Sequence, residues 1–246
     1  MSFISRVVYL ILRCIIYVIY PKTKIFGAEN LPDEGAILVG NHTKMNGPII
    51  AQLYLPGKNK IWCASQMMTM SEVPAYAYKD FWSGKPKWIQ WFYKMLSHII
   101  APLAVIIFKN ADTIPVYRDL RLKSTFRMTE EYLQEGNNIV IFPEHYKDHN
   151  NIINDFQDRF IDIARFYYKK TGKKVSFVPL YNAPMLHSAY IGKPITYDEN
   201  TDIKIERKRI CDYLMDEITA IAVSLPKHKV VTYANLRKKD YPYNKD

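Results

Sequence analysis

Cysteine is scarce in this chain of 246 residues, which has three, Cys14, Cys63 and Cys211, and no CxxC pair. An odd, widely spaced set argues against a disulfide scaffold or a thiolate zinc site and fits a reducing compartment. Glycine is also sparse, at 9 residues, and no glycine-rich phosphate loop is present. Because 48% of the residues are hydrophobic, low-complexity and disordered chains are excluded as well.

Acidic residues are in short supply. Asp and Glu together number 24 against 34 Lys and Arg, which gives a net charge of +10, and aromatic residues make up 14% of the chain. Such a composition suits two anionic partners, nucleic acid or a lipid surface. The sequence has no helix-turn-helix pattern, zinc finger or ribonucleoprotein-type aromatic motif. We therefore expect an anionic membrane surface as the partner, and no nucleic acid.

The N-terminal segment has no acid before Glu29 and is nearly all apolar from Phe3 to Tyr20. Its Arg6 and Arg13 project from one side of a helix. The run is shorter than the roughly 20 apolar residues that span a bilayer, and an arginine at the bilayer centre costs about 2.5–3.5 kcal/mol. We expect residues 1–24 to form an interfacial helix that makes the protein peripheral or monotopic on the cytoplasmic face of the cell membrane. A spanning helix and a plain core helix remain alternatives, and a signal peptide fits less well.

A second apolar stretch runs from Trp88 to Phe108. Its uninterrupted part, Ile99–Phe108, has only ten residues and contains Pro102, so we expect it to be too short to span a membrane. The preceding tryptophans resemble an interfacial belt. A buried helix that leads into a buried strand is the alternative.

Strand-like and helical patterns alternate through the rest of the chain, with no repeat or linker, so residues 25–246 are expected to form one α/β domain. Alternation of this kind predicts a mostly parallel central sheet covered by helices on both faces. The expected strands are Ala36–Gly40, Ile61–Ala64, Thr113–Tyr117, Asn138–Phe142 and Val175–Tyr181, and the expected helices are Leu122–Glu135, Asp155–Thr171 and Ile203–Leu225.

In such sheets, chemistry collects beyond the carboxyl ends of the strands. Asn41-His42 directly follows the first expected strand, and Pro48 suits the first turn of a helix that begins there. The partial positive charge of a helix N-terminus favours a neutral imidazole, the form that a general base needs. Arg118 and Lys147 follow two further strands, and both are cations able to hold a phosphate.

These residues resemble motifs of the glycerolipid acyltransferase superfamily, typified by 1-acylglycerol-3-phosphate acyltransferases. The family has four motifs, namely NHxxxxD, an apolar run that ends in arginine, FPEGTR and an apolar V-P. All four have a match here, in the same order, over about residues 25 to 185. The matches are Asn41-His42, Ile114–Arg118, Phe142-Pro143-Glu144 and Val178-Pro179.

The resemblance implies an O-acyltransferase of phospholipid biosynthesis that needs no metal and no bound cofactor. His42 would deprotonate the hydroxyl of a lysophospholipid, which attacks an acyl thioester on coenzyme A or acyl carrier protein as co-substrate. Arg118 and the third motif would bind the phosphate of the acceptor, with Glu144 helping to shape that pocket. From the residues themselves, we also expect Asn46 and Glu144 to assist His42 in catalysis. The substrate-binding residues that we expect are Asn41, Arg118, His145 and Lys147.

Two departures from the family pattern matter. Gly47 stands where the family has the Asp that orients the imidazole, and Asn46 beside it carries no charge. Either another carboxylate serves His42, with Glu144, Glu72 and Asp80 as candidates, or catalysis is weak or absent. FPEGTR is FPEHYK here, so Lys147 keeps the charge of the family's arginine without its bidentate fork, and the acceptor headgroup is open.

Other interpretations come from different classes. A catalytically silent protein that binds lipid or an acyl carrier on the same scaffold is the main alternative. A metal site would need Glu144, His145, Asp148 and His149 together, but their spacing is not that of HExxH. Cys63 follows an expected strand, yet no base is paired with it, which favours a buried thiol over a nucleophile.

Overall fold

The fold was obtained as a computed structural model that describes residues 3–82, 84–233 and 236–245. The chain divides into two compact units. The first unit comprises residues up to 21 together with 62–125, and the second comprises residues 22–61 together with 126–246. The expected N-terminal helix thus belongs to the unit that also contains the second apolar stretch.

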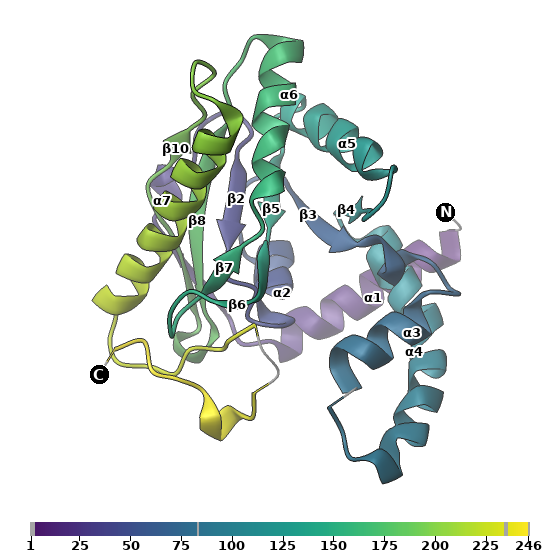
Figure 1. Ribbon diagram of the computed structural model, residues 1–246. Coiled ribbons are helices and arrows are strands. Elements are labelled where there is room, and N and C mark those ends of the chain that lie inside the picture. The colour runs from purple at the N-terminus through teal and green to yellow at the C-terminus, as the bar shows by residue number, and fades with distance from the viewer. Residues whose placement is uncertain (1–2, 83, 234–235, 246) are drawn as a thin grey trace. The chain divides into compact units, whose positions relative to one another are not determined.

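An eight-stranded sheet has the order β1-β9-β8-β2-β5-β3-β4, with β10 paired to β8 (Figure 1). Four neighbouring pairs are parallel, β1–β9, β2–β8, β2–β5 and β3–β5, while β8 pairs antiparallel with β9 and β10. The expected α/β class with a mostly parallel sheet is therefore confirmed. The strands are β1 (Lys24–Phe26), β2 (Ile37–Gly40), β3 (Asn59–Ala64), β4 (Thr113–Val116), β5 (Asn138–Ile141), β8 (Ser176–Ala183), β9 (Ser188–Ile191) and β10 (Ile195–Thr196).

The two central strands, β2 and β5, are buried along their whole length. Both are continuous apolar runs rather than alternating ones, as expected of parallel strands covered on both faces. In the second unit, α6 and α7 lie in front of the sheet and α2 behind it (Figure 1). Right-handed crossovers that leave β2 and β5 in opposite directions along the sheet place their helices on opposite faces. These helices are α2 (Asn46–Leu53), α6 (Asp162–Thr171) and α7 (Ile203–Ser224).

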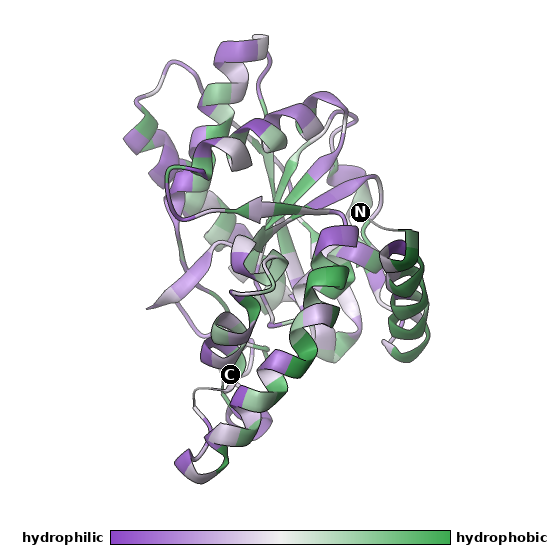
Figure 2. Ribbon diagram, turned by 90° about the vertical axis from the view of Figure 1, so that its right-hand side faces the viewer, coloured by the Kyte–Doolittle hydropathy of each residue, from purple (hydrophilic) through white to green (hydrophobic). Residues whose placement is uncertain are grey.

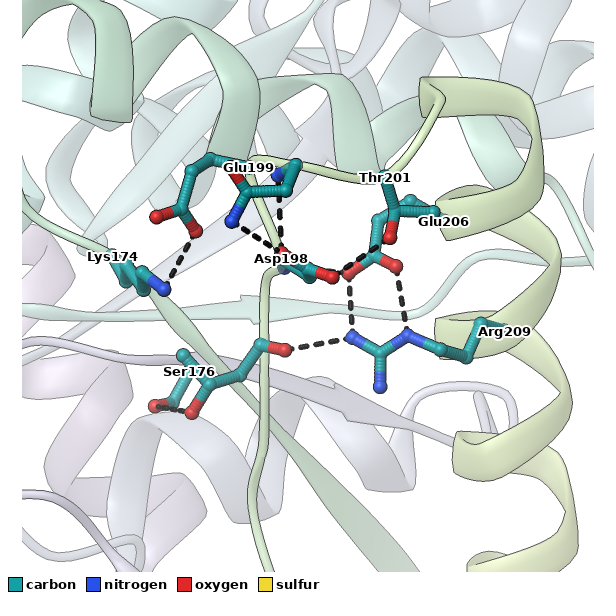
Figure 3. A network of polar contacts seen from close by, with 9 residues as sticks. Lys174, Ser176, Asp198, Glu199, Thr201, Glu206 and Arg209 are labelled. Carbon is teal, nitrogen blue, oxygen red and sulfur yellow. Dashed lines mark hydrogen bonds and ion pairs between the residues drawn. The ribbon is translucent and has the colours of Figure 1, made fainter.

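Helix α7 begins in a network of polar contacts (Figure 3). The carboxylate of its cap, Asp202, accepts a hydrogen bond from the backbone N–H of Lys204 at 2.9 Å. One turn on, the fully buried Glu206 accepts from Arg209 and from the backbone N–H of Asp198 at 2.8 Å. A buried carboxylate is tolerated there because both of its oxygens have partners.

The first unit contains α1 (Phe3–Ile19), α3 (Val73–Ala77), α4 (Gln90–Asn110) and β4, and the N-terminal residues of α5 (Leu122–Gln134). Helix α4 packs against both α1 and α3. A small core joins α3 and α4, formed by Met67, Val73, Ala77, Ala101 and Ala104. Shorter turns complete the chain, namely Ala28–Asn30, Ser65–Met68, Tyr78–Trp82, Lys87–Ile89, Asp158–Ile161, Pro184–Leu186 and Lys238–Asp240.

Helix α1 is hydrophobic along nearly its whole length, as Figure 2 shows at the end marked N. Tyr9 is its one buried residue among those described. Large apolar side chains are exposed on it, with Val18 81% accessible, and the others are Phe3, Ile4, Val7, Leu10, Ile11, Ile15, Tyr17 and Ile19. The described residues of the first unit leave this apolar surface uncovered.

The expectation for the second apolar stretch is wrong. Residues 90–110 form one continuous helix, α4, that passes through Pro102 instead of ending in a strand. Proline removes one backbone donor, but the rest of the helical ladder carries the chain past it. Among the described residues, one helix, over Lys87–Asn110, is long and apolar enough to cross a membrane by length and composition. Nor is this stretch a buried helix, since Trp88 is 75% exposed and Ile99 is also exposed.

The five expected strands are confirmed, and two of the three expected helices agree with α5 and α7 to within a residue. The third begins late, because Asn154–Phe156 forms strand β7 and α6 starts only at Asp162. Strand β7 pairs antiparallel with β6 (Glu144–Asp148) in a separate two-stranded sheet. The polar FPEHYK segment therefore lies on a hairpin.

Candidate functional site

Three neighbouring parallel strands, β8, β2 and β5, bring their carboxyl ends to one edge of the sheet. The register pairs Val39 of β2 with Ile141 of β5. Three residues beyond this pair, His42 and Glu144 are therefore level with each other. On the other side of β2, Gly40 pairs with Leu180 of β8, which brings Asn182 to the same edge.

Glu144 joins the loop that follows β2 to the hairpin that follows β5. Its Oε1 accepts a hydrogen bond from the backbone N–H of His42 at 2.6 Å, and its Oε2 accepts from the backbone N–H of Asn154 at 2.8 Å. The side chain is only 4% exposed. Burial raises the pKa of this carboxyl from 4.5 to about 7, although both N–H donors act in the opposite direction. Glu144 thus holds the main chain at His42.

Asn41 and Asn182 hold the next pair of strand ends together. Asn41 Nδ2 donates to the Asn182 carbonyl at 3.0 Å, the backbone N–H of Asn182 donates to Asn41 Oδ1 at 2.6 Å, and Asn182 Nδ2 donates to the Asn41 carbonyl at 3.0 Å. Both residues are buried. The peptide unit between Asn41 and His42 is thereby held from both neighbouring strand ends, by Asn182 at its carbonyl and by Glu144 at its N–H.

The imidazole of His42 is half-buried between two aromatic rings. The rings of Phe142 and Tyr233 both meet it edge-on, with centroid separations of 5.5 Å. Burial lowers the pKa of His42 below 6.5, and backbone groups of Lys44 and of His42 itself offset part of that effect. The ring is therefore neutral at pH 7 and able to accept a proton.

Gly47 occupies a position with no room for a side chain. A Cβ there would lie 2.7 Å from the carbonyl oxygen of His42 and 2.9 Å from Cε1 of Phe142. Contacts this short require the backbone or the ring to move. At this position the Phe142 ring and the turn after His42 fill the space that a side chain would need.

The turn after His42 is strained. Thr43 and Lys44 both have positive φ, 43° and 57°, which costs non-glycine residues about 1–2 kcal/mol each. Asn46 supports this turn, because its backbone N–H and its Nδ2 donate to the Thr43 carbonyl at 3.1 and 2.9 Å. Thr43 itself is fully buried.

Lys147 and His145 of the β6–β7 hairpin face an acid. Lys147 Nζ donates to Asp155 Oδ2 at 2.7 Å, and Nε2 of His145 lies 3.9 Å from the same oxygen. This contact with Lys147 holds the pKa of Asp155 below its usual value. A phosphate that binds Lys147 has to compete with Asp155 for it. Among the described residues, no three His, Cys, Asp or Glu side chains are placed as ligands for a metal ion.

Arg118 belongs to the first unit, where it follows β4. Burial raises the pKa of Asp80 in that unit, and the charge of Arg118 offsets part of the rise. Glu72 and Asp80, two of the three carboxylates considered for His42, lie in that unit, while His42 and Glu144 lie in the other. Cys63 is a weak candidate for a nucleophile, because burial raises the pKa of its thiol to about 12.

Sequence patterns alone did not identify Asn182, Asn154 or Tyr233. Asn182 had a usable signal, since it follows the V-P motif at the end of a strand expected in the same sheet. Asn154 lies on a strand that was expected to be the start of a helix. Tyr233 lies 191 positions after His42 in a segment without a motif, so only the fold brings the two rings together.

Comparison with known proteins gives a limited result. A scan of protein families and a search of curated proteins found no match. Among solved structures, the chain is similar to the crystal structure of the 1-acyl-sn-glycerophosphate (LPA) acyltransferase PlsC from Thermotoga maritima. That similarity covers 88% of this chain and 79% of the other, with 15% sequence identity and a TM-score of 0.46.

Glu144→Gln is expected to remove a pH dependence of the stability. Because the pKa of Glu144 rises from 4.5 to about 7 on folding, the folded protein holds this proton more tightly than the unfolded chain. The contribution of this proton to the free energy of unfolding is therefore fully present below pH 4.5. It is lost, by about 3 kcal/mol at most, as the pH rises through 7. Urea unfolding at pH 5 and pH 8 measures the difference.

The exposed Glu131→Gln is the matched control and should keep the wild-type pH dependence. An equal fall in the free energy of unfolding between pH 5 and pH 8 in the wild type and in Glu144→Gln contradicts the assignment to Glu144.

Proposed function

We propose that this protein is an O-acyltransferase that moves a fatty acyl group from acyl-coenzyme A or acyl carrier protein to the hydroxyl of a lysophospholipid resembling 1-acylglycerol-3-phosphate. One observation carries the proposal. A histidine whose pKa lies below 6.5 is held by its main chain at the carboxyl end of a central parallel strand, where active sites of such sheets collect. The four motif matches in the family's order support this assignment.

The chemistry assigned to His42 is general base catalysis. Its neutral imidazole takes the proton of the acceptor hydroxyl, the hydroxyl oxygen forms a bond to the acyl carbonyl carbon, and the carbon–sulfur bond breaks. The leaving thiolate then takes the proton back from the imidazolium. The products are the new ester and the free thiol, so no oxidant or metal takes part.

The remaining roles concern the acceptor and its pocket. In the second unit, Lys147 would hold the phosphate of the acceptor, with His145 beside it on the hairpin. For Arg118, in the first unit, the same role stays a prediction from the sequence. Asn41, Asn46 and Glu144 act through the main chain around His42, by the hydrogen bonds described above.

The membrane is the proposed location of both substrate and product. Helices α1 and α4 expose large apolar side chains within the first unit, and the chain carries a net charge of +10. An apolar helix with flanking cations binds an anionic bilayer through burial and charge together. We propose that the protein is peripheral or monotopic on the cytoplasmic face of the cell membrane.

The packing at Gly47 favours a second candidate, a catalytically silent protein that binds lipid or an acyl carrier on the same scaffold. An Asn in place of the Asp of the serine-protease triad costs about 10⁴-fold in turnover. Here that position has no side chain and no space for one. Acyl transfer and its dependence on His42 separate the two candidates.

His42→Ala is expected to lower acyl transfer by about 10²–10⁴-fold, because the acceptor hydroxyl loses its base. The assay follows labelled acyl groups from acyl-coenzyme A and from acyl carrier protein onto a panel of lysophospholipids. The exposed His149→Ala should keep wild-type activity. Undiminished transfer by folded His42→Ala refutes the base, and a wild type that is silent on the whole panel favours the binding protein.

Ile11→Glu with Val18→Glu is expected to weaken binding to anionic vesicles about tenfold or more, because each exposed apolar side chain contributes about 1.5–3 kcal/mol when buried. Cosedimentation with phosphatidylglycerol vesicles is the measurement. Ile205→Glu is the matched control, since Ile205 is 63% exposed on α7 in the other unit. Equal pelleting of the double variant and the wild type contradicts the role of α1.

A further inference from the structure

The C-terminal segment, residues 226–245, folds back onto the second unit, and its positions 234 and 235 lie outside the described residues. Its base is tied down by His228 and Asn244. His228 Nε2 lies 2.8 Å from the hydroxyl of the buried Tyr181, and the backbone N–H of His228 donates to Asn244 Oδ1 at 2.8 Å. Asn244 Nδ2 in turn donates to the carbonyl of Ala222 in α7 at 2.7 Å. These contacts fix both ends of the segment.

Between its fixed ends, the C-terminal segment contacts the strained turn that follows His42. Lys44 Nζ donates to the Tyr241 hydroxyl at 2.9 Å and to the Leu236 carbonyl at 3.2 Å. Lys44 is one of the two residues with positive φ in that turn. The segment therefore stabilises the conformation in which the loop presents His42.

The same segment places the ring of Tyr233 against the imidazole of His42. The planes of these two rings are inclined at 72°, and the plane of the imidazole is inclined at 64° to the ring of Phe142. Tyr233 is itself supported by the ring of Tyr146, with centroids 5.0 Å apart. Edge-to-face pairs of this kind contribute about 0.5–1.5 kcal/mol each beyond their buried area, which is enough to favour one ring orientation.

We infer that Tyr233 is a positioning residue for His42. Its ring fixes the imidazole by packing, at a site where Gly47 and Phe142 leave no room for an orienting carboxylate. A role of Tyr233 in catalysis rests on the proposed acyl transfer. Its effect on the orientation and burial of the His42 imidazole does not depend on that proposal. Tyr233 is assigned no contact with the reacting atoms.

Among the described residues of the second unit, charged and titratable groups face His42 or its loop from three elements. Glu144 of β6 accepts from its main chain, Lys44 of its own loop points to the C-terminal segment, and Tyr233 and Tyr241 come from that segment. Removing the Tyr233 ring admits water without removing any of the other groups. The expected consequence is a rise in the pKa of His42 toward its ordinary value.

The experiment is an NMR titration of the histidine Hε1 signals in the full chain. It compares the wild type, Tyr233→Ala, Tyr233→Phe and Tyr243→Ala, with His42→Gln to identify the His42 signal. Tyr243 is the matched control, because it lies on the same segment, is half-exposed, and is in contact with the side chains of Lys227 and Lys229. The signal of His228, at the base of the segment, reports whether the segment stays attached.

In Tyr233→Ala, the titration midpoint of His42 is expected to rise by roughly half a unit or more. Tyr233→Phe and Tyr243→Ala should titrate like the wild type, and His228 should not move. Where acyl transfer is measurable, Tyr233→Ala should lower kcat about tenfold or more with little change in KM, and Tyr233→Phe should restore it.

Identical His42 titrations in Tyr233→Ala and the wild type overturn the inference. So does an equal shift in Tyr233→Phe, which would assign the effect to the hydroxyl, or a displaced His228 signal, which would assign it to detachment of the segment. A wild type without acyl transfer refutes the proposed function instead, and the titration still decides the role of Tyr233.

Discussion

The site depends on a buried carboxyl group that joins two strand ends. Glu144 accepts the backbone N–H of His42 with one oxygen and that of Asn154 with the other, so the loop after β2 cannot move apart from the β6–β7 hairpin. Two N–H donors compensate only partly for the cost of burial, as the pKa of about 7 indicates. This cost falls at the point where the main chain carries the imidazole of His42.

The side chain of His42 is held by different means from its main chain. Aromatic rings of Phe142 and Tyr233 flank the imidazole, and burial lowers its pKa. Gly47 completes this arrangement, because a larger residue would collide with the His42 carbonyl and with Phe142. A neutral, oriented imidazole is therefore reached through packing and exclusion of water. In the family that the motifs resemble, a carboxylate has that task.

Much of this could be predicted from the sequence, because the signals were local. Apolar runs bounded by turns predicted the five strands, and strand order in an α/β sheet brought Asn41-His42 and Glu144 to one edge. The hairpin at Asn154 was missed, since Phe156 and Phe160 also fit the face of a helix. The sequence pattern predicts a break at Pro102, whereas α4 continues through it, so the length of this helix could not be predicted. Tyr233 could not be found, since its contact with His42 depends on how a distant segment folds back.

The most direct test of the account is Gly47→Asp, which introduces a carboxylate at the position where the resembling motif has one and where the packing leaves no space. We expect a free energy of unfolding lower by about 1–3 kcal/mol and no gain in acyl transfer, because the backbone or the Phe142 ring has to move. Gly84→Asp is the control, since nothing lies within 4 Å of a Cβ at that position. A Gly47→Asp protein that is as stable as the wild type and transfers acyl groups faster would contradict the account.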